Sequence, residues 1–155
     1  MVPTENIYEG IRDERYLDLA KYFSTWSKDP SRGVGACAIG EHGQVLSQGY
    51  NGFPRGVNDD IERYENKDFK YRYVVHAELN VIYNASLNGV SLKGSTLYVY
   101  GLPVCNECAK GIIQSGILRV VGPKNGFDDA SEKWKVHALD TQKMFKESGV
   151  IYDFI

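Results

Sequence analysis

The chain has 155 residues, of which 43% are hydrophobic and 25% charged, and its formal net charge is −2. These values are typical of a single globular domain, 1–155, and argue against an intrinsically disordered chain. A slightly acidic chain without an obvious basic patch also argues against a nucleic-acid partner. Because no apolar run approaches a membrane span and MVPTENIYEG lacks a signal-peptide pattern, the sequence predicts a cytoplasmic protein without a membrane partner.

The first half of the chain is expected to form a helix, a hairpin and a long loop. Apolar residues at three- and four-residue steps predict one face of an amphipathic helix within 12–27. Two apolar stretches within 35–50, joined by a short turn, predict a β-hairpin. Gly, Pro, Asn and Asp dominate 51–60 and indicate a loop. The polar run 61–72 shows no clear period, so the sequence assigns it to no element.

The second half of the chain alternates between helix and strand. In order, the pattern predicts a helix at 76–89, a strand at 95–101, a helix at 105–116, a strand at 117–122, a helix within 129–148, and a terminal strand or tail at 150–155. Glycines are expected to end two of these helices, at Gly89 and Gly149. Short links between strand, helix and strand imply parallel strands with a right-handed crossover, so the fold class is α/β, with helices packed on one sheet.

Two helix starts carry the residues with the strongest chemistry. His76 and Glu78 open one predicted helix, and Cys105 and Cys108 open the next. At a helix start the unpaired N–H groups and the positive end of the dipole favour a thiolate over a thiol. If the two helices lie side by side on one sheet, the imidazole and both sulfurs converge in a set that suits tetrahedral Zn²⁺. Three protein ligands leave the fourth position open for water, as in a catalytic zinc site, and Glu78 is then free to handle protons.

Other interpretations of these residues stay open at this point. A C-x-x-C pair is also typical of a redox site or of half a structural zinc site. A structural site needs a fourth ligand, for which the remaining candidates are Cys37, His42 and His137. Cys37 lies in an apolar stretch and is most simply a small core residue.

Four stretches together resemble a known family. They are SKDPSRGVGA, GYNGFPRGVNDD, YVVHAE and CNECAKGIIQSGI. In order and spacing they resemble the deoxycytidylate (dCMP) deaminase family of the zinc-dependent cytidine/deoxycytidylate deaminase superfamily, whose signature is H-x-E followed by P-C-x-x-C. The resemblance covers 14–122. It implies a cytidine-deaminase-like three-layer fold with one mixed sheet of about five strands flanked by helices.

The resemblance also implies an activity, which is hydrolysis of dCMP to dUMP and ammonia with Zn²⁺ as cofactor. His76, Cys105 and Cys108 would hold the metal, and Glu78 would pass protons from water to the ring nitrogen N3 and to the departing amine. The backbone amide of Ala77 would meet the pyrimidine carbonyl.

Recognition of the rest of the nucleotide is expected from two loops. Arg32, with Ser31 beside it, is the best candidate for binding a phosphate. Asn51 suits a sugar hydroxyl. In relatives that dCTP activates and dTTP inhibits, the GYNGFP segment lies near the effector site. The possible effector-binding residues here are therefore Gly49, Asn51, Gly52 and Arg55. The family further implies a homo-oligomer, either a hexamer or a dimer.

One departure from the family signature bears on the substrate. The family has proline directly before the first cysteine, whereas Val104 stands between Pro103 and Cys105. The loop from Tyr100 to Val104 is therefore expected to take a different path beside the metal. Two alternatives follow: a deaminase of the same fold acting on another nucleoside, nucleotide or base, and a non-catalytic zinc-binding scaffold.

Overall fold

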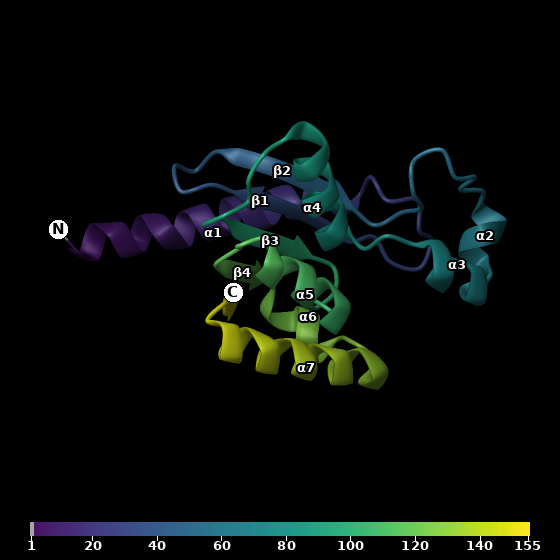
Figure 1. Ribbon diagram of the computed structural model, residues 1–155. Coiled ribbons are helices and arrows are strands. Elements are labelled where there is room, and N and C mark those ends of the chain that lie inside the picture. Colours follow the sequence, from purple (N-terminus) through teal and green to yellow (C-terminus); the bar gives the residue numbers. More distant parts are fainter. Residues whose placement is uncertain (1) are drawn as a thin grey trace.

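The computed structural model describes the backbone of residues 2–155 and the side chains of residues 12–126 and 128–155. Figure 1 shows a central sheet with the long helix α1 (Val2–Ser24) along one side. Helices α4 and α5 cover the other face, and α7 packs against α5 and the edge strand β5. The molecule therefore has three layers, helix, sheet and helix, as predicted. No helix within residues 2–155 is long and apolar enough to cross a membrane.

The sheet has five strands in the order β2-β1-β3-β4-β5. They are β1 (Gly35–Ile39), β2 (Val45–Tyr50), β3 (Thr96–Tyr100), β4 (Arg119–Gly122) and β5 (Ile151–Phe154). Strand β1 pairs antiparallel with β2 and β3, whereas β3, β4 and β5 run parallel to one another. The sheet is thus mixed, and both the hairpin and the parallel strand-helix-strand unit are confirmed. The C-terminal segment is a strand and not a tail.

The remaining helices follow the sequence pattern with two exceptions. They are α2 (Ile61–Glu65), α3 (Lys67–Tyr73), α4 (Ala77–Asn88), α5 (Asn106–Gln114), α6 (Lys124–Asp128) and α7 (Glu132–Ser148). Helix α4 ends at Gly89 (φ 68°) and α7 at Gly149 (φ 87°), left-handed positions that glycine occupies without strain. The unassigned run 61–72 contains α2 and α3, which are too short to show a helical period. Helix α6 was not predicted.

The predicted first helix, 12–27, was wrong at both ends, because α1 begins at Val2 and ends before residue 27. Helix α1 stops at Ser24, so Trp26 lies beyond it and is 47% exposed. The ring of Trp26 packs edge-on against the rings of Phe23 and Tyr50. Trp26 therefore joins the apolar surface of the helix although it is not part of the helix.

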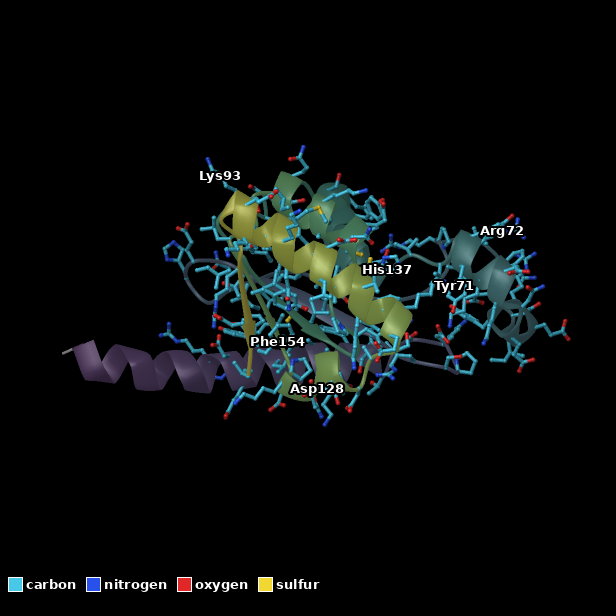
Figure 2. The ribbon with its side chains drawn as sticks, turned by 90° about the horizontal axis from the view of Figure 1, so that it is seen from below. Tyr71, Arg72, Lys93, Asp128, His137 and Phe154 are labelled. Atoms are coloured by element: carbon cyan, nitrogen blue, oxygen red, sulfur yellow. The ribbon has the colours of Figure 1, made fainter. Side chains whose placement is uncertain are left out.

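Helices α2 and α3 stand at one end of the sheet, away from α1 (Figure 1). Figure 2 shows Tyr71 and Arg72 on this projection, whereas His137 lies on α7. The projection is held together by stacked aromatic rings, including Phe53 on Tyr64, with ring centroids 4.4 Å apart. An antiparallel bridge between Gly52 and Val75 ties its base to the body. This arrangement places α3 beside the start of α4.

Candidate active site

Helices α4 and α5 pack against each other, and three potential metal ligands meet at their N-termini. His76 is the N-cap residue of α4, Cys105 is the N-cap residue of α5, and Cys108 lies one turn later. The Nδ1 atom of His76 lies 3.4 Å from the Sγ atom of Cys105 and 3.3 Å from that of Cys108. Tetrahedral zinc places nitrogen and sulfur ligands roughly 3.5 Å apart, so the three side chains fit this metal.

Among the described residues, this convergent group contains His76, Cys105 and Cys108 and no fourth His, Cys, Asp or Glu. Cys37 is buried on the α1 face of the sheet, where burial raises its pKa to about 12, as expected of an inert core thiol. His42 lies in the hairpin turn. A three-ligand site leaves one position open, as catalytic zinc requires and structural zinc does not.

The helix start favours the ionised form of Cys105. Its Sγ atom accepts a hydrogen bond from the backbone N–H of Cys108 at 3.5 Å. Hydrogen bonding from the Cys108 thiol, together with the bond from His76, lowers the pKa of Cys105 to about 4 despite its burial. A hydrogen bond with Cys105 in turn raises the pKa of His76. The lowered pKa of Cys105 favours a thiolate in the place where a metal cation would bind.

Glu78 lies in the first turn of α4 and is only 3% exposed. Burial raises the pKa of its carboxyl group to about 7. A carboxyl group with this pKa exchanges protons readily in both directions at neutral pH, which is what a general acid–base residue must do. Glu78 is not part of the convergent ligand group, yet it lines the same cavity as His76.

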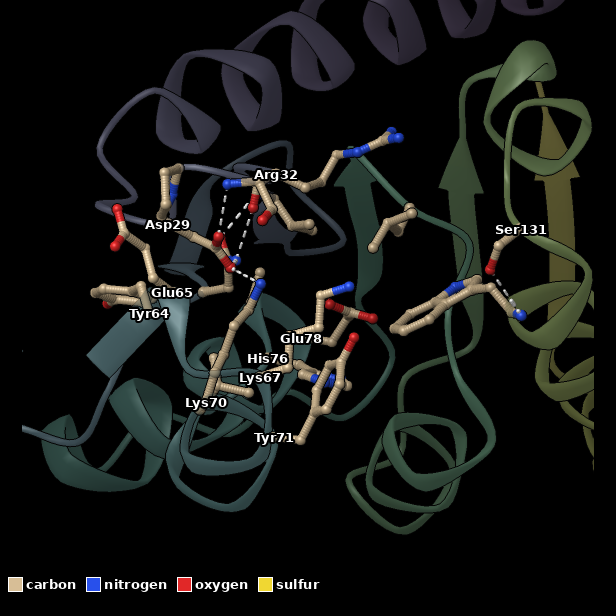
Figure 3. Close-up of a pocket in the computed structure, with 18 residues that line it drawn as sticks. Asp29, Arg32, Tyr64, Glu65, Lys67, Lys70, Tyr71, His76, Glu78 and Ser131 are labelled. Carbon is tan, nitrogen blue, oxygen red and sulfur yellow. Dashed lines mark hydrogen bonds and ion pairs between the residues drawn. The ribbon is translucent and has the colours of Figure 1, made fainter. Parts of the chain in front are cut away.

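A cavity of about 620 Å³ opens in front of these residues (Figure 3). Its lining comes from the 29–34 loop, Asn51, helices α2 and α3, the start of α4, Leu102, and the start of α7. This volume lies within the usual range for sites that bind small molecules. Figure 3 shows His76 and Glu78 within the cavity, with Asp29 and Lys70 on one side and Ser131 on the other.

The structure brings the predicted phosphate residues to this cavity. Ser31 and Arg32 both line it, and Nη1 of Arg32 donates to the carbonyl of Gly101 at 2.9 Å. The backbone N–H of Ser31 donates to Oδ1 of Asp29, so the loop is fixed by its own hydrogen bonds. Ala77 is fully buried at the first helical position of α4 and also lines the cavity.

Asn51 lies in the cavity wall and is 7% exposed. Its Oδ1 atom accepts a hydrogen bond from the N–H of Val34 at 2.8 Å, and its Nδ2 atom donates to the carbonyl of Arg32 at 3.0 Å. The side chain therefore ties β2 to the 29–34 loop. Nδ2 also donates to Oδ2 of Asp29 at 3.5 Å, so one lone pair of Oδ1 is left, and contact with a sugar hydroxyl stays a prediction.

The other predicted effector residues do not line the cavity. Gly49 lies under α4, where a Cβ atom would stand 2.6 Å from the carbonyl of Ala77, so this position admits only glycine. Gly52 pairs with Val75, and the exposed Arg55 donates to Oδ1 of Asn84 on α4. A role for these residues in effector binding stays a prediction.

Several residues of the cavity were missed by sequence reasoning. They are Asp29, Pro30 and Val34 from the loop before β1, Tyr64, Glu65, Lys67, Lys70 and Tyr71 from α2 and α3, Val74, Leu102 from the loop after β3, and Ser131 and Trp134 from the start of α7. Lys70 forms an ion pair with Asp29 at 2.7 Å, in which both side chains are largely buried. The only sequence signal for α3 was the mixture of basic and aromatic residues in a segment without a period.

Val104, the departure from the family signature, lies in the core and not in the cavity wall. Its side chain is fully buried, its N–H donates to the hydroxyl oxygen of Tyr152, and its carbonyl accepts from Oγ1 of Thr141. Leu102 is the residue of this loop that faces the cavity. Contacts with α7 and β5 thus hold the extra residue in the core, outside the cavity wall.

A histidine and two cysteines at adjacent helix N-termini, with a buried glutamate beside them, define the class of zinc-dependent deaminases. The chain belongs to the family described as the cytidine and deoxycytidylate deaminase zinc-binding region, whose model matches residues 11–122. Zinc is accordingly the metal for which the three ligands are built.

Relatives and solved structures agree with this family. The deoxycytidylate deaminase of Mus musculus is 41% identical, over 91% of this chain and 81% of its own length. The deoxycytidylate deaminase of Homo sapiens is 40% identical over the same shares. The crystal structure of the dCMP deaminase from the cyanophage S-TIM5 matches the fold with a TM-score of 0.71, at 24% identity, covering 92% of this chain and 96% of that one. The fold predicted from the resemblance is therefore confirmed.

Proposed function

We propose that this protein hydrolyses dCMP to dUMP and ammonia. The observation that carries the proposal is the buried Glu78 beside the three convergent ligands in a cavity of nucleotide size. The mouse and human relatives named deoxycytidylate deaminase, at 41% and 40% identity over most of the chain, support dCMP as the substrate. A solved S-TIM5 structure of similar fold is a complex with dCMP and dUMP.

The chemistry divides between the metal and Glu78. When bound, zinc supplies a water acidic enough to lose a proton near neutral pH and so to attack C4 of the base. Glu78 accepts that proton and delivers it to N3 of the ring. It then transfers the second proton of the water to the exocyclic nitrogen. The C4–N bond breaks, ammonia leaves, and the C4 carbonyl of uracil remains.

The rest of the cavity is proposed to orient the nucleotide. The N–H of Ala77 lies at the open end of α4, where unpaired donors are available to the pyrimidine carbonyl. Arg32 and Ser31 would meet the phosphate, with Lys67 of α3 adding positive charge to the same cavity. Lys70 is neutralised by its ion pair with Asp29 and is better suited to holding α3 in place.

The direct test is the ultraviolet change as cytosine becomes uracil, combined with measurement of ammonia, for the zinc-loaded protein with dCMP. Deoxycytidine, CMP and dCTP serve as comparison substrates, and Glu78→Gln is the matched variant. We expect dCMP to be the preferred substrate and the kcat of Glu78→Gln to fall by roughly 10²- to 10⁴-fold. Preference for another base or nucleoside would support a same-fold deaminase of different specificity, and absence of any turnover across the panel would support a zinc-binding scaffold.

Regulation, assembly and location belong to the same proposal. We expect dCTP to increase and dTTP to decrease activity at low dCMP, and Arg55→Ala to weaken this response. A substrate curve that neither nucleotide changes would exclude regulation.

Light scattering after size-exclusion chromatography tests for the expected dimer or hexamer. A cytoplasmic location is consistent with ligand cysteines that must stay reduced to bind metal.

A further inference from the structure

The start of α7 supplies one wall of the cavity next to the metal ligands. Trp134 lines the cavity, and the centroid of its ring lies 5.8 Å from that of His76, with the ring planes at 43°. Figure 3 shows Ser131, the residue that caps this helix, across the cavity from Lys70. We infer that Trp134 is the surface on which the base of the substrate stacks, and that it is a specificity-determining residue for pyrimidine nucleotides. This inference rests on the proposed function.

The indole ring is held in a fixed orientation before any ligand binds. Its Nε1 atom donates to the carbonyl of Pro103 at 2.8 Å, and its backbone N–H donates to Oγ of Ser131 at 3.3 Å. One residue further along the loop, Thr141 of α7 donates to the carbonyl of Val104 at 2.8 Å. Helix α7 is therefore fastened directly to the residues that precede Cys105. These bonds fix the distance between the indole and the metal ligands.

The two ends of the cavity differ in chemistry. Arg32 and Lys67 line the cavity toward the 29–34 loop and α3, where a phosphate finds positive charge, whereas the charge of Lys70 is taken up by its ion pair with Asp29. His76 and Trp134 line the other part, where the reacting atom of the base must lie. A pyrimidine placed with C4 next to the metal ligands is within stacking distance of a ring only 5.8 Å from His76. The half-buried indole thus offers its apolar surface where the base requires one.

Base stacking on an aromatic side chain contributes enough to be measured in the Michaelis constant. Removing such a ring weakens binding by roughly tenfold or more, and it acts on substrate and transition state alike. We therefore expect Trp134→Leu to raise KM for dCMP about tenfold while kcat changes by less than about threefold. Trp134→Phe, which keeps a flat ring but loses the bond to Pro103, is expected to recover most of the loss.

Fluorescence gives a second readout that does not depend on turnover. The chain has two tryptophans, and Trp26 does not line the cavity. Trp26→Phe therefore leaves Trp134 as the only tryptophan. Titrating the zinc-loaded Trp26→Phe protein with dUMP, the reaction product, is expected to quench fluorescence in a saturable way. Deoxyribose 5-phosphate, which has no base, is expected to leave the fluorescence unchanged.

The outcomes separate this inference from the proposed function. Absence of dCMP turnover by the wild-type protein would contradict the proposed function. Turnover of dCMP with an unchanged KM in a zinc-containing, folded Trp134→Leu protein would contradict the stacking role alone. If Trp134→Leu does not fold, the Trp26→Phe titration decides. Binding of dUMP, measured by equilibrium dialysis, without any change in Trp134 fluorescence would overturn the inference.

Discussion

Two buried carboxylic acids on opposite faces of the sheet show how the surroundings of the same group set its ionisation in opposite directions. Asp13 of α1 is 8% exposed and Glu78 of α4 is 3% exposed. Asp13 accepts hydrogen bonds from the hydroxyl of Tyr98 at 2.6 Å and from both terminal nitrogens of Arg119 at 2.8 Å. Glu78 faces the cavity beside the metal ligands.

Their surroundings move the two pKa values in opposite directions. Burial alone would raise the pKa of Asp13, but the hydrogen bonds from Arg119 and Tyr98 outweigh it and lower the pKa. For Glu78 burial dominates and raises the pKa to about 7. A carboxylate with a full set of partners is held in one ionisation state and fastens α1 to the sheet. A carboxyl group poised near neutrality is available for proton transfer.

The largest effect is expected where the proposed metal site loses one of its three ligands. Cys108→Ser removes a thiolate ligand from a three-ligand site, so both zinc binding and turnover should fall below detection. Metal analysis of the purified protein and the dCMP assay check this result. Cys37→Ser is the matched control, because Cys37 is buried away from the site. Full zinc content in Cys108→Ser would contradict the ligand assignment.

The next effect concerns Glu78, the residue proposed to transfer protons. Glu78→Gln keeps the size of the side chain but cannot carry protons, so kcat should fall by roughly 10²- to 10⁴-fold. The zinc content should stay at one ion per chain, because Glu78 is outside the ligand group. Loss of zinc together with activity would instead make Glu78 a ligand.

On the opposite face, Asp13→Asn should reduce the free energy of unfolding by about 1–3 kcal/mol at pH 7 and leave kcat unchanged. Because the folded pKa of Asp13 is lowered, its ionised form stabilises the protein above the unfolded pKa. That contribution is lost as the pH falls through the lowered folded value. Urea denaturation at pH 7 and below pH 4 should therefore show a difference between Asp13→Asn and wild type that shrinks in acid.

The smallest expected effect concerns Asp153, the second carboxylate that binds Arg119. Asp153 also binds Arg119, with Oδ2 2.8 Å from Nε, but its side chain is 46% exposed. An exposed partner is screened by water, so Asp153→Asn should lower the free energy of unfolding by no more than about 1 kcal/mol. The same denaturation series measures it. If Asp153→Asn lowered the free energy of unfolding as much as Asp13→Asn, the expectation that the more exposed carboxylate contributes less would be wrong.

Sequence reasoning found what local spacing determines. The three potential metal ligands and Glu78 lie at predicted helix starts, and these starts become neighbours if both helices pack side by side on one sheet, as they do. The contribution of Lys67, Lys70 and Trp134 depends on contacts between distant segments. Examples are the pair between Lys70 and Asp29 and the bond from Trp134 to Pro103. Neither contact leaves a periodic signal in the chain.

The most direct test compares Glu78→Gln and Asp13→Asn in a single experiment, measuring both dCMP turnover and the melting temperature. We expect Glu78→Gln to melt within a few degrees of the wild type, to keep its zinc and to lose nearly all turnover. We expect Asp13→Asn to melt at a lower temperature and to keep its kcat. Substantial turnover of dCMP by zinc-loaded Glu78→Gln would contradict the central claim that the buried carboxyl group of α4 moves the protons.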